Sequence, residues 1–222
     1  VDGRADACRA LSIPVVGGNV SLYNESRGTD IDPTPIITVL GVVDELTRRP
    51  PGVRLVEGGR LIMLGETVRE LSGSMWARRR GHRRGTLPAV DIDAVARVAG
   101  VLRQLVNDGL VLGAHDVSTG GLGAAVAEMA IGSGVGARIA RVDDHVALFS
   151  ESAGRAVVCV AVDQVREALD VCEAAGVPAT KLGAAMDDRL VVKDLIDVAL
   201  SDLTRIWRDR LPTQLGGGTT QG

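Results

Sequence analysis

The stretch VLGAHDVSTGGLGAAVAEMA, residues 111–130, decides the fold class. Residues 111–118 predict a short strand that enters a polar turn, because an apolar start gives way to Asp and Ser. Thr119 and the two glycines after it begin a predicted helix over about 121–131. A strand followed at once by a helix is the repeating unit of α/β proteins.

The same alternation extends to both sides of this stretch. Apolar runs predict strands at 60–66, 134–140, 145–150 and 155–162, and a pair of strands at 178–185 and 189–194 joined by residues 186–188. Apolar residues at spacings of three and four predict helices from Asp91 to a stop at 107–109, from Val165 to Gly176, and over 202–210. We therefore expect an α/β layered domain over about 57–210.

The opening of the chain does not complete a core of its own. Residues 4–11 look like the end of a helix, and 13–20 and 36–43 look like two strands separated by a polar loop. The chain starts with Val-Asp-Gly, inside this helix-like segment. We therefore expect a piece of a longer polypeptide, with partners elsewhere for these strands.

Composition and charge exclude several classes of function. Aromatic residues make up 2% of the chain and the net charge is −3, so neither base-stacking platforms nor an overall basic field favours nucleic-acid binding. The three cysteines are widely spaced and form no CxxC pair, which argues against a zinc site and a disulfide framework. No apolar run reaches membrane-spanning length and no signal peptide is present. We expect no membrane association and a cytoplasmic location.

The segment GGNVSLYNE, residues 17–25, is the first with the chemistry of a site. Gly17 and Gly18 allow a ligand to approach the backbone closely, since no Cβ blocks it. Asn19 and Glu25 offer the oxygen ligands that Mg²⁺ prefers, and Ser21 offers a hydroxyl. The alternative is a polar turn between two strands.

Two further segments carry weaker signals. In HDVSTGG, residues 115–121, the glycines at a helix start suit an anion and Asp116 suits a metal or a ribose hydroxyl; the alternative is a helix capped by Ser118 or Thr119. In LFSESAGR, residues 148–155, Glu151 and Ser152 either contact a ligand or cap a helical turn. Neighbouring residues on a strand point to opposite faces, so the adjacency of His115 and Asp116 does not indicate a catalytic dyad.

The densest charge cluster is RRRGHRR, residues 78–84. Its five arginines predict either a solvated loop or a surface that binds phosphate groups or an acidic partner. No GxSxG or GxxxxGK[ST] sequence occurs, so a serine-hydrolase elbow and a Walker loop are unsupported.

GGNVSLYNE, HDVSTGGLGAAVAEMA and LFSESAGR, in this order, resemble the second half of the large subunit of the phosphoribosylformylglycinamidine synthase family. The resemblance covers about residues 5–210. It implies an α/β, PurM-like fold: the end of a second PurM N-terminal-like domain at 1–45, a linker at 46–56, a PurM C-terminal-like domain of layered helices and mixed sheet at 57–205, and a terminal helix end and flexible tail at 206–222.

The resemblance also implies an activity. The family uses ATP and ammonia to turn formylglycinamide ribonucleotide into the corresponding amidine in purine biosynthesis, and the ammonia comes from a glutaminase domain or subunit. The implied cofactors are ATP and Mg²⁺. The implied partners are the first half of the same polypeptide, the glutaminase subunit and a small accessory subunit. Since the family's catalytic histidine lies in that first half, we expect this chain alone to be inactive.

By this resemblance Gly18 contacts ATP, Asn19 binds Mg²⁺ and Ser21 contacts the substrate. Asp116, Glu151 and Ser152 match a pseudo-site related to the working site by internal symmetry. Thr119 stands where the family's motif has Asp, which weakens the case for chemistry there. The alternative function is a non-catalytic scaffold that supports the fold and the contacts between subunits.

Overall fold

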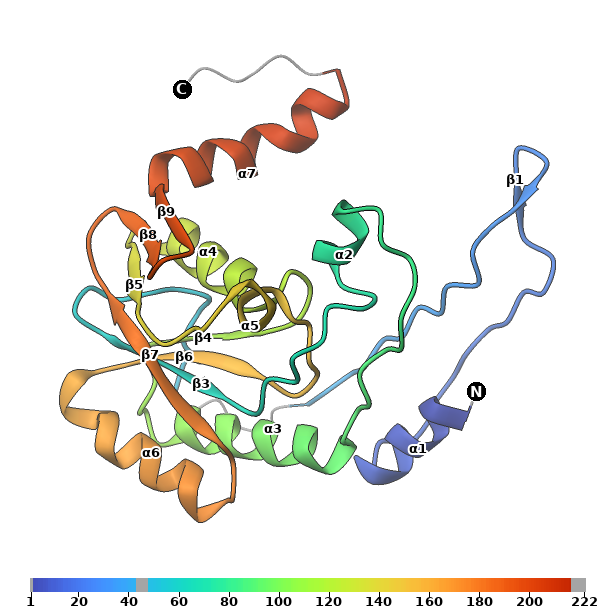
Figure 1. Cartoon of the computed structure of the whole chain (residues 1–222). Coiled ribbons are helices and arrows are strands. Elements are labelled where there is room, and N and C mark those ends of the chain that lie inside the picture. Colours follow the sequence, from blue (N-terminus) through green and yellow to red (C-terminus); the bar gives the residue numbers. More distant parts are fainter. Residues whose placement is uncertain (1, 43–47, 217–222) are drawn as a thin grey trace. The chain divides into compact units, whose positions relative to one another are not determined.

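The computed structural model describes residues 2–42 and 48–216, and the chain divides into two compact units, Val1–Arg49 and Pro50–Gly222. Figure 1 shows the elements of both. The second unit begins inside the stretch 46–56 that we expected to be a linker, and Leu55 of that stretch is buried in its core. Each unit is described by itself.

The first unit contains little regular structure. Helix α1, Asp2–Ala10, confirms the predicted helix, and a hairpin pairs β1, Glu25–Ser26, with β2, Thr29–Asp30. The strands predicted at 13–20 and 36–43 were wrong for the described residues: 13–20 and 36–42 are irregular and largely exposed, and residue 43 lies outside the described part. A β-branched run forms a strand only where a neighbouring strand accepts its backbone hydrogen bonds, and the described residues offer these two segments no such neighbour.

The second unit is built around a seven-stranded mixed sheet with the order β4-β6-β3-β7-β5-β8-β9. All neighbouring strands are antiparallel except β5 and β8, which are parallel. The strands are β3 Arg60–Leu64, β4 Gly113–Asp116, β5 Ala137–Ile139, β6 Ala156–Val160, β7 Ala179–Ala185, β8 Arg189–Val192 and β9 Ile196–Ala199.

Helices cover both faces of this sheet, as Figure 1 shows. They are α2 Met75–Arg79, α3 Ile92–Asn107, α4 Gly121–Ser133, α5 His145–Phe149, α6 Val165–Ala174, which follows a short 3₁₀ turn at Val162–Gln164, and α7 Leu200–Gln214. Residues of β3 alternate between the two layers: Leu61 and Met63 belong to the apolar cluster that includes α4, while Ile62 and Leu64 belong to the cluster that includes α3 and α6. The predicted α/β layered fold with a mixed sheet is thereby confirmed.

Local signals set the helix ends. The side chain of Asp91 accepts a hydrogen bond from the Ala94 amide at 2.9 Å and so caps α3, as predicted. Gly109, with φ of 74°, follows the last turn of that helix. In the described residues, no helix is both long and apolar enough to cross a membrane.

Two predictions in this unit were wrong. Residues 145–149 form helix α5 instead of a strand, because Asp144 caps the amides of Val146 and Ala147 at 3.0 Å each. Strands β7 and β8 do not pair with each other: β5 lies between them, antiparallel to β7 and parallel to β8. Strand β9 was not foreseen.

Candidate functional site

The segment at 17–25 is exposed in the first unit. A Cβ added at Gly17 or Gly18 would meet no heavy atom within 4 Å, so the backbone is open on the side where a ligand would approach. Within the described residues, the one side-chain hydrogen bond at this segment runs from Asn24 Nδ2 to the carbonyl oxygen of Ser21, at 2.9 Å. The side-chain oxygens of Asn19 and Ser21 therefore remain available to a ligand.

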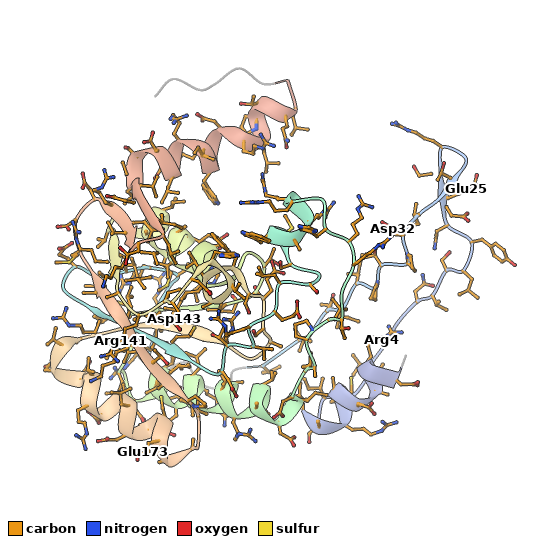
Figure 2. All side chains as sticks on the ribbon, in the orientation of Figure 1. Arg4, Glu25, Asp32, Arg141, Asp143 and Glu173 are labelled. Carbon is orange, nitrogen blue, oxygen red and sulfur yellow. The ribbon has the colours of Figure 1, made fainter. Side chains whose placement is uncertain are left out.

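Glu25 follows on the first strand of the hairpin and is exposed, as Figure 2 shows. The turn of this hairpin uses positive φ at Arg27 and Gly28, 55° and 76°. Asn19 and Glu25 together have the chemistry of a hard-cation site, since both present oxygen. They are only part of a ligand set, because Mg²⁺ takes six ligands in octahedral geometry.

Glu151 in the second unit has an internal role in this structure. Its Oε1 accepts hydrogen bonds from the backbone amides of Met75 and Gly120, both at 2.8 Å. Met75 is the first residue of α2, and Gly120 is the N-cap residue of α4. One carboxylate oxygen therefore joins three segments of the domain, and its charge strengthens both bonds.

Ser152 is also engaged internally. Its hydroxyl accepts from the Val68 amide at 2.9 Å and lies 3.0 Å from the Val68 carbonyl oxygen and 2.7 Å from the Ser150 hydroxyl. Ser150 in turn donates to the same Val68 carbonyl at 2.7 Å. Both serines are buried. Val68 lies after the end of β3, where its backbone no longer pairs with a neighbouring strand. The two serine hydroxyls form hydrogen bonds with its amide and carbonyl groups instead.

Arg155 completes this arrangement, and sequence reasoning did not single it out. It is 4% exposed and donates to the carbonyl oxygens of Ser150 and Ser152 and to Thr67 Oγ1, at 2.6, 3.1 and 3.1 Å. No carboxylate among the described residues lies within ion-pair distance of its guanidinium. Burial without a counter-charge lowers the pKa of Arg155 to about 10. The guanidinium locks the turn at 150–155 onto the loop after β3.

Asp116 belongs to a second polar group. His115 Nδ1 lies 3.1 Å from Asp116 Oδ1, and His115 Nε2 lies 2.8 Å from Glu128 Oε2, so the imidazole sits between two carboxylates. Ser118 donates to Asp116 Oδ2 at 2.6 Å, and this bond, followed by the charge of His115, lowers the pKa of Asp116. Adjacency on the strand did not predict this contact, in which Asp116 is the last residue of β4.

The glycine pair before α4 does not leave an open anion cradle. Gly120, with φ of 83°, is the N-cap residue, and neither Ser118 nor Thr119 caps this helix. The Gly120 amide is already bound by Glu151, so the anion at this helix start is the chain's own carboxylate. A Cβ on Gly121 would lie 2.6 Å from the carbonyl oxygen of Ser150, which explains the glycine there by close packing.

Within the described residues, no group of three or more His, Cys, Asp or Glu side chains has the arrangement of a metal site. The nearest approach is His115 with Asp116 and Glu128, but the two carboxylates meet opposite nitrogens of the ring and do not converge on one point. The structure thus places the predicted residues in two sets. Gly18, Asn19 and Ser21 are exposed in the first unit, and Asp116, Glu151 and Ser152 form hydrogen bonds within the second.

The fold and these segments define an α/β protein in which polar segments connect strands and helices: 117–120 connects β4 to α4, and 150–155 connects α5 to β6. The family model described as AIR synthase related protein, C-terminal domain, matches residues 56–194, and the model for the N-terminal domain of the same family matches residues 1–43. The chain belongs to the AIR synthase related protein family.

Among curated proteins, the chain is 44% identical over 216 residues to phosphoribosylformylglycinamidine synthase subunit PurL of Nocardioides sp., covering 96% of this chain and 28% of that protein. It is also 44% identical over 218 residues to subunit PurL of Frankia casuarinae, covering 96% of this chain and 29% of that protein. The predicted resemblance to this synthase is confirmed. The chain spans somewhat under a third of the length of these relatives.

Among solved structures, PurL of Thermotoga maritima complexed with FGAR matches with a TM-score of 0.60 and 19% identity, covering 70% of this chain and 29% of that one. The same protein complexed with ATP matches with a TM-score of 0.57 and 18% identity, covering 70% of this chain and 27% of that one. These matches support the fold.

Proposed function

We propose that this chain supplies part of the active site of a phosphoribosylformylglycinamidine synthase, an ATP-dependent carbon–nitrogen ligase of purine biosynthesis. The observation that carries the proposal is the oxygen-rich segment at 17–25, in which the side chains of Asn19 and Ser21 are left available. The likeness to PurL, 44% identity over 96% of this chain, supports it. The assignment of residues 1–45 and 57–205 to two domain types belongs to this proposal.

The proposed reaction replaces the carbonyl oxygen of the glycinamide group of formylglycinamide ribonucleotide with nitrogen from ammonia, and the formyl group stays unchanged. ATP phosphorylates the amide oxygen and leaves as ADP; ammonia then adds to the amide carbon, and phosphate departs to leave the amidine. In this scheme the open backbone at Gly18 binds ATP, Asn19 offers one oxygen to Mg²⁺, and the hydroxyl of Ser21 orients the substrate. The other Mg²⁺ ligands come from phosphate, water and the rest of the enzyme.

The proposed partners follow from the same likeness. The solved structure of PurLQS from Thermotoga maritima, an assembly that contains PurL, is among those whose fold this chain shares. The partners that we propose for this chain are the first half of the same polypeptide, a glutaminase subunit that supplies ammonia, and a small accessory subunit. The proposed location is the cytoplasm.

The second unit has a supporting role in this proposal. Glu151 and Ser152, which match the pseudo-site, bind the chain's own backbone at 2.8–2.9 Å. This observation favours the scaffold alternative for residues 57–205, while the catalytic contribution comes from 17–25. The 222-residue chain alone is then inactive.

The test is a double substitution, Asn19→Ala with Ser21→Ala, in the complete enzyme that contains this sequence. We expect kcat/KM for ammonia-dependent ADP release to fall by about 100-fold or more, because two groups that contact the reacting ligands are lost. Ser26→Ala with Thr29→Ala removes two hydroxyls from the neighbouring hairpin and should leave kcat/KM within about threefold of the parent. Unchanged kcat/KM in the first variant would contradict the site assignment.

A second measurement separates the catalytic and scaffold roles. If the second unit is a scaffold, millimolar Mg²⁺-ATP does not raise the unfolding temperature of the isolated chain, since only a ligand that binds the native state stabilises it. A clear upward shift that is lost on Asp116→Asn would instead show that the pseudo-site binds nucleotide. Turnover by the isolated chain would contradict its proposed inactivity.

A further inference from the structure

The arginine cluster at 78–84, which the proposed function does not use, carries unbalanced positive charge. Arg78, Arg79, Arg80, Arg83 and Arg84 are all exposed, and none forms an ion pair with any described residue. Several other arginines of this unit are paired, for example Arg69 with Asp144 and Arg138 with Asp187. Since the chain as a whole carries a net charge of −3, this is a local concentration of cations.

The first half of the cluster is anchored to the domain. Helix α2 ends in a closed turn in which the His82 amide donates to the Ala77 carbonyl at 2.9 Å and Gly81 takes a φ of 75°. Trp76 stacks on His145 of α5, with ring centroids 5.1 Å apart, and the guanidinium of Arg80 lies 4.8 Å from the centre of the Trp76 ring. These two contacts hold the indole ring in place, and the ring forms one wall of a pocket.

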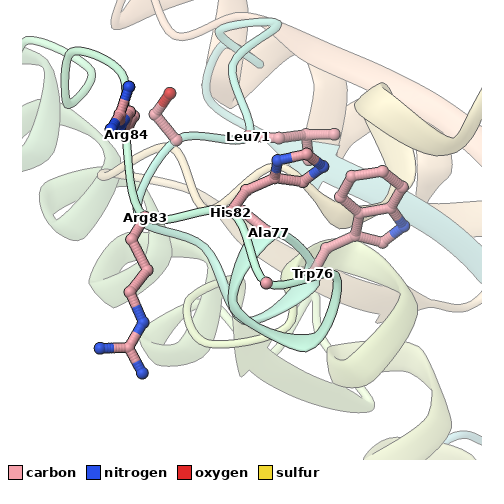
Figure 3. Close-up of a pocket in the computed structure, with 8 residues that line it drawn as sticks. Leu71, Trp76, Ala77, His82, Arg83 and Arg84 are labelled. Atoms are coloured by element: carbon pink, nitrogen blue, oxygen red, sulfur yellow. The ribbon is translucent and has the colours of Figure 1, made fainter.

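A pocket with a volume of about 370 Å³ opens beside this wall. Figure 3 shows its apolar side and its basic side together. The apolar residues are Leu71, Trp76 and Ala77; the basic residues are His82, Arg83 and Arg84. Arg83 is drawn with its guanidinium turned away, and because its side chain is exposed, other rotamers are open to it.

We propose that this pocket binds a small molecule that carries a phosphate group, with Arg83 and Arg84 as the anion ligands and Trp76 and Leu71 against its carbon skeleton. Guanidinium groups pair with phosphate through two parallel hydrogen bonds. The volume lies in the range of small-molecule sites, and the apolar wall gives a non-polar part somewhere to pack. A long polyanion is disfavoured, because it would need a basic stripe and the rest of the chain is acidic.

The site lies wholly in the second unit and shares no residue with 17–25, so it is independent of the proposed function. A phosphorylated metabolite bound in this pocket contacts none of residues 17–25. The proposal therefore does not require this metabolite to be a substrate of the enzyme. The chemistry that recognises it is a phosphate dianion attached to a small carbon body.

Trp76 gives a direct assay. The chain has two tryptophans, and Trp207 is exposed on α7, so Trp207→Phe leaves Trp76 as the single fluorescent reporter in the pocket wall. In this background we titrate ribose 5-phosphate, with ribose as the control lacking phosphate and inorganic pyrophosphate as the control lacking a carbon body. We expect saturable quenching by ribose 5-phosphate, weaker binding of pyrophosphate, and no response to ribose.

Matched arginine variants distinguish binding at a defined site from general electrostatic attraction between the phosphate and the arginine cluster. Arg83→Ala with Arg84→Ala should weaken binding of ribose 5-phosphate by about tenfold or more, which corresponds to about 1.4 kcal/mol or more. Arg78→Ala with Arg79→Ala makes the same charge change on α2 without touching the pocket lining, and should stay within about threefold of the parent.

Three outcomes would overturn the proposal. The first is no saturable response to ribose 5-phosphate at low salt. The second is equal weakening in both arginine pairs, which would show attraction by charge alone. The third is binding of a polyglutamate peptide in the absence of ribose 5-phosphate binding, which would make the cluster a surface for an acidic protein. Far-ultraviolet circular dichroism confirms that each variant is folded before titration.

Discussion

Replacing Glu151 should loosen the starts of two helices at once. Its Oε1 holds the amide of Met75 at the start of α2 and the amide of Gly120 at the start of α4, at 2.8 Å each. A hydrogen bond to a charged acceptor contributes about 1.5–3 kcal/mol to stability, and two bonds that share one oxygen contribute less than twice that. We expect Glu151→Ala to lower the free energy of unfolding by about 2–4 kcal/mol.

Glu151→Gln separates charge from geometry. Glutamine keeps an acceptor oxygen of the same reach but without the charge, so both bonds persist at the strength of neutral ones, about 1 kcal/mol each. We expect Glu151→Gln to lower the free energy of unfolding by about half as much as Glu151→Ala does. Glu173→Ala, an exposed glutamate on α6 with the same chemical change, should stay within about 0.5 kcal/mol of the parent.

The assay is urea unfolding followed by circular dichroism, combined with hydrogen exchange of the two amides in the native state. Met75 and Gly120 should exchange faster in Glu151→Ala, while the amides of the central strand β3 should lose protection only as far as global stability falls. Unchanged exchange at both amides, or a stability within about 0.5 kcal/mol of the parent, would refute the reasoning.

Three further predictions concern backbone and charge. Gly121→Ala should destabilise the domain by about 2–4 kcal/mol in urea unfolding, because its Cβ would lie 2.6 Å from the Ser150 carbonyl oxygen at a φ of 65°. Gly100→Ala, inside α3 with no atom within 4 Å of the new Cβ, should raise stability by about 0.5–1 kcal/mol; a loss would contradict the packing. The folded-state pKa of Asp116 is lowered, chiefly by the Ser118 hydroxyl, so the stability it contributes is present above its unfolded pKa and lost as pH falls through the lower folded value. The stability difference between the parent and Asp116→Asn, measured across acid pH, should therefore shrink as pH falls below about 4.

Most of the second unit could be predicted because its signals are local. For example, helix α3 is predicted by signals from one short stretch of sequence: the cap at Asp91, the apolar spacing within the helix and the stop at Gly109. The two errors have a different origin. The apolar run at 146–149 is as compatible with a strand as with a helix, and only the cap at Asp144 decides that 145–149 is a helix. The insertion of β5 between β7 and β8 joins segments far apart in the chain, which no local pattern reports.

The candidate site shows the same division. Spacing along the chain singles out Glu151 and Ser152, but the loops they bind are 31 to 84 residues away, so their structural role appears only in three dimensions. Arg155 lay inside a segment that was already of interest, and an arginine directly before a strand carries no sequence signal that it is buried. The prediction of strands at 13–20 and 36–43 was wrong because β-branched residues favour a strand only where a sheet is present for them to pack against.

The position of β3 has a consequence for how the domain is made. This apolar strand is among the first parts of the second unit to be synthesised, and it pairs on both edges with β6 and β7, which come much later. Non-local pairing of this kind makes folding slow. While the polypeptide is growing, β3 has two unpaired edges, so a chaperone that shields residues 60–64 during translation should raise the yield of native protein.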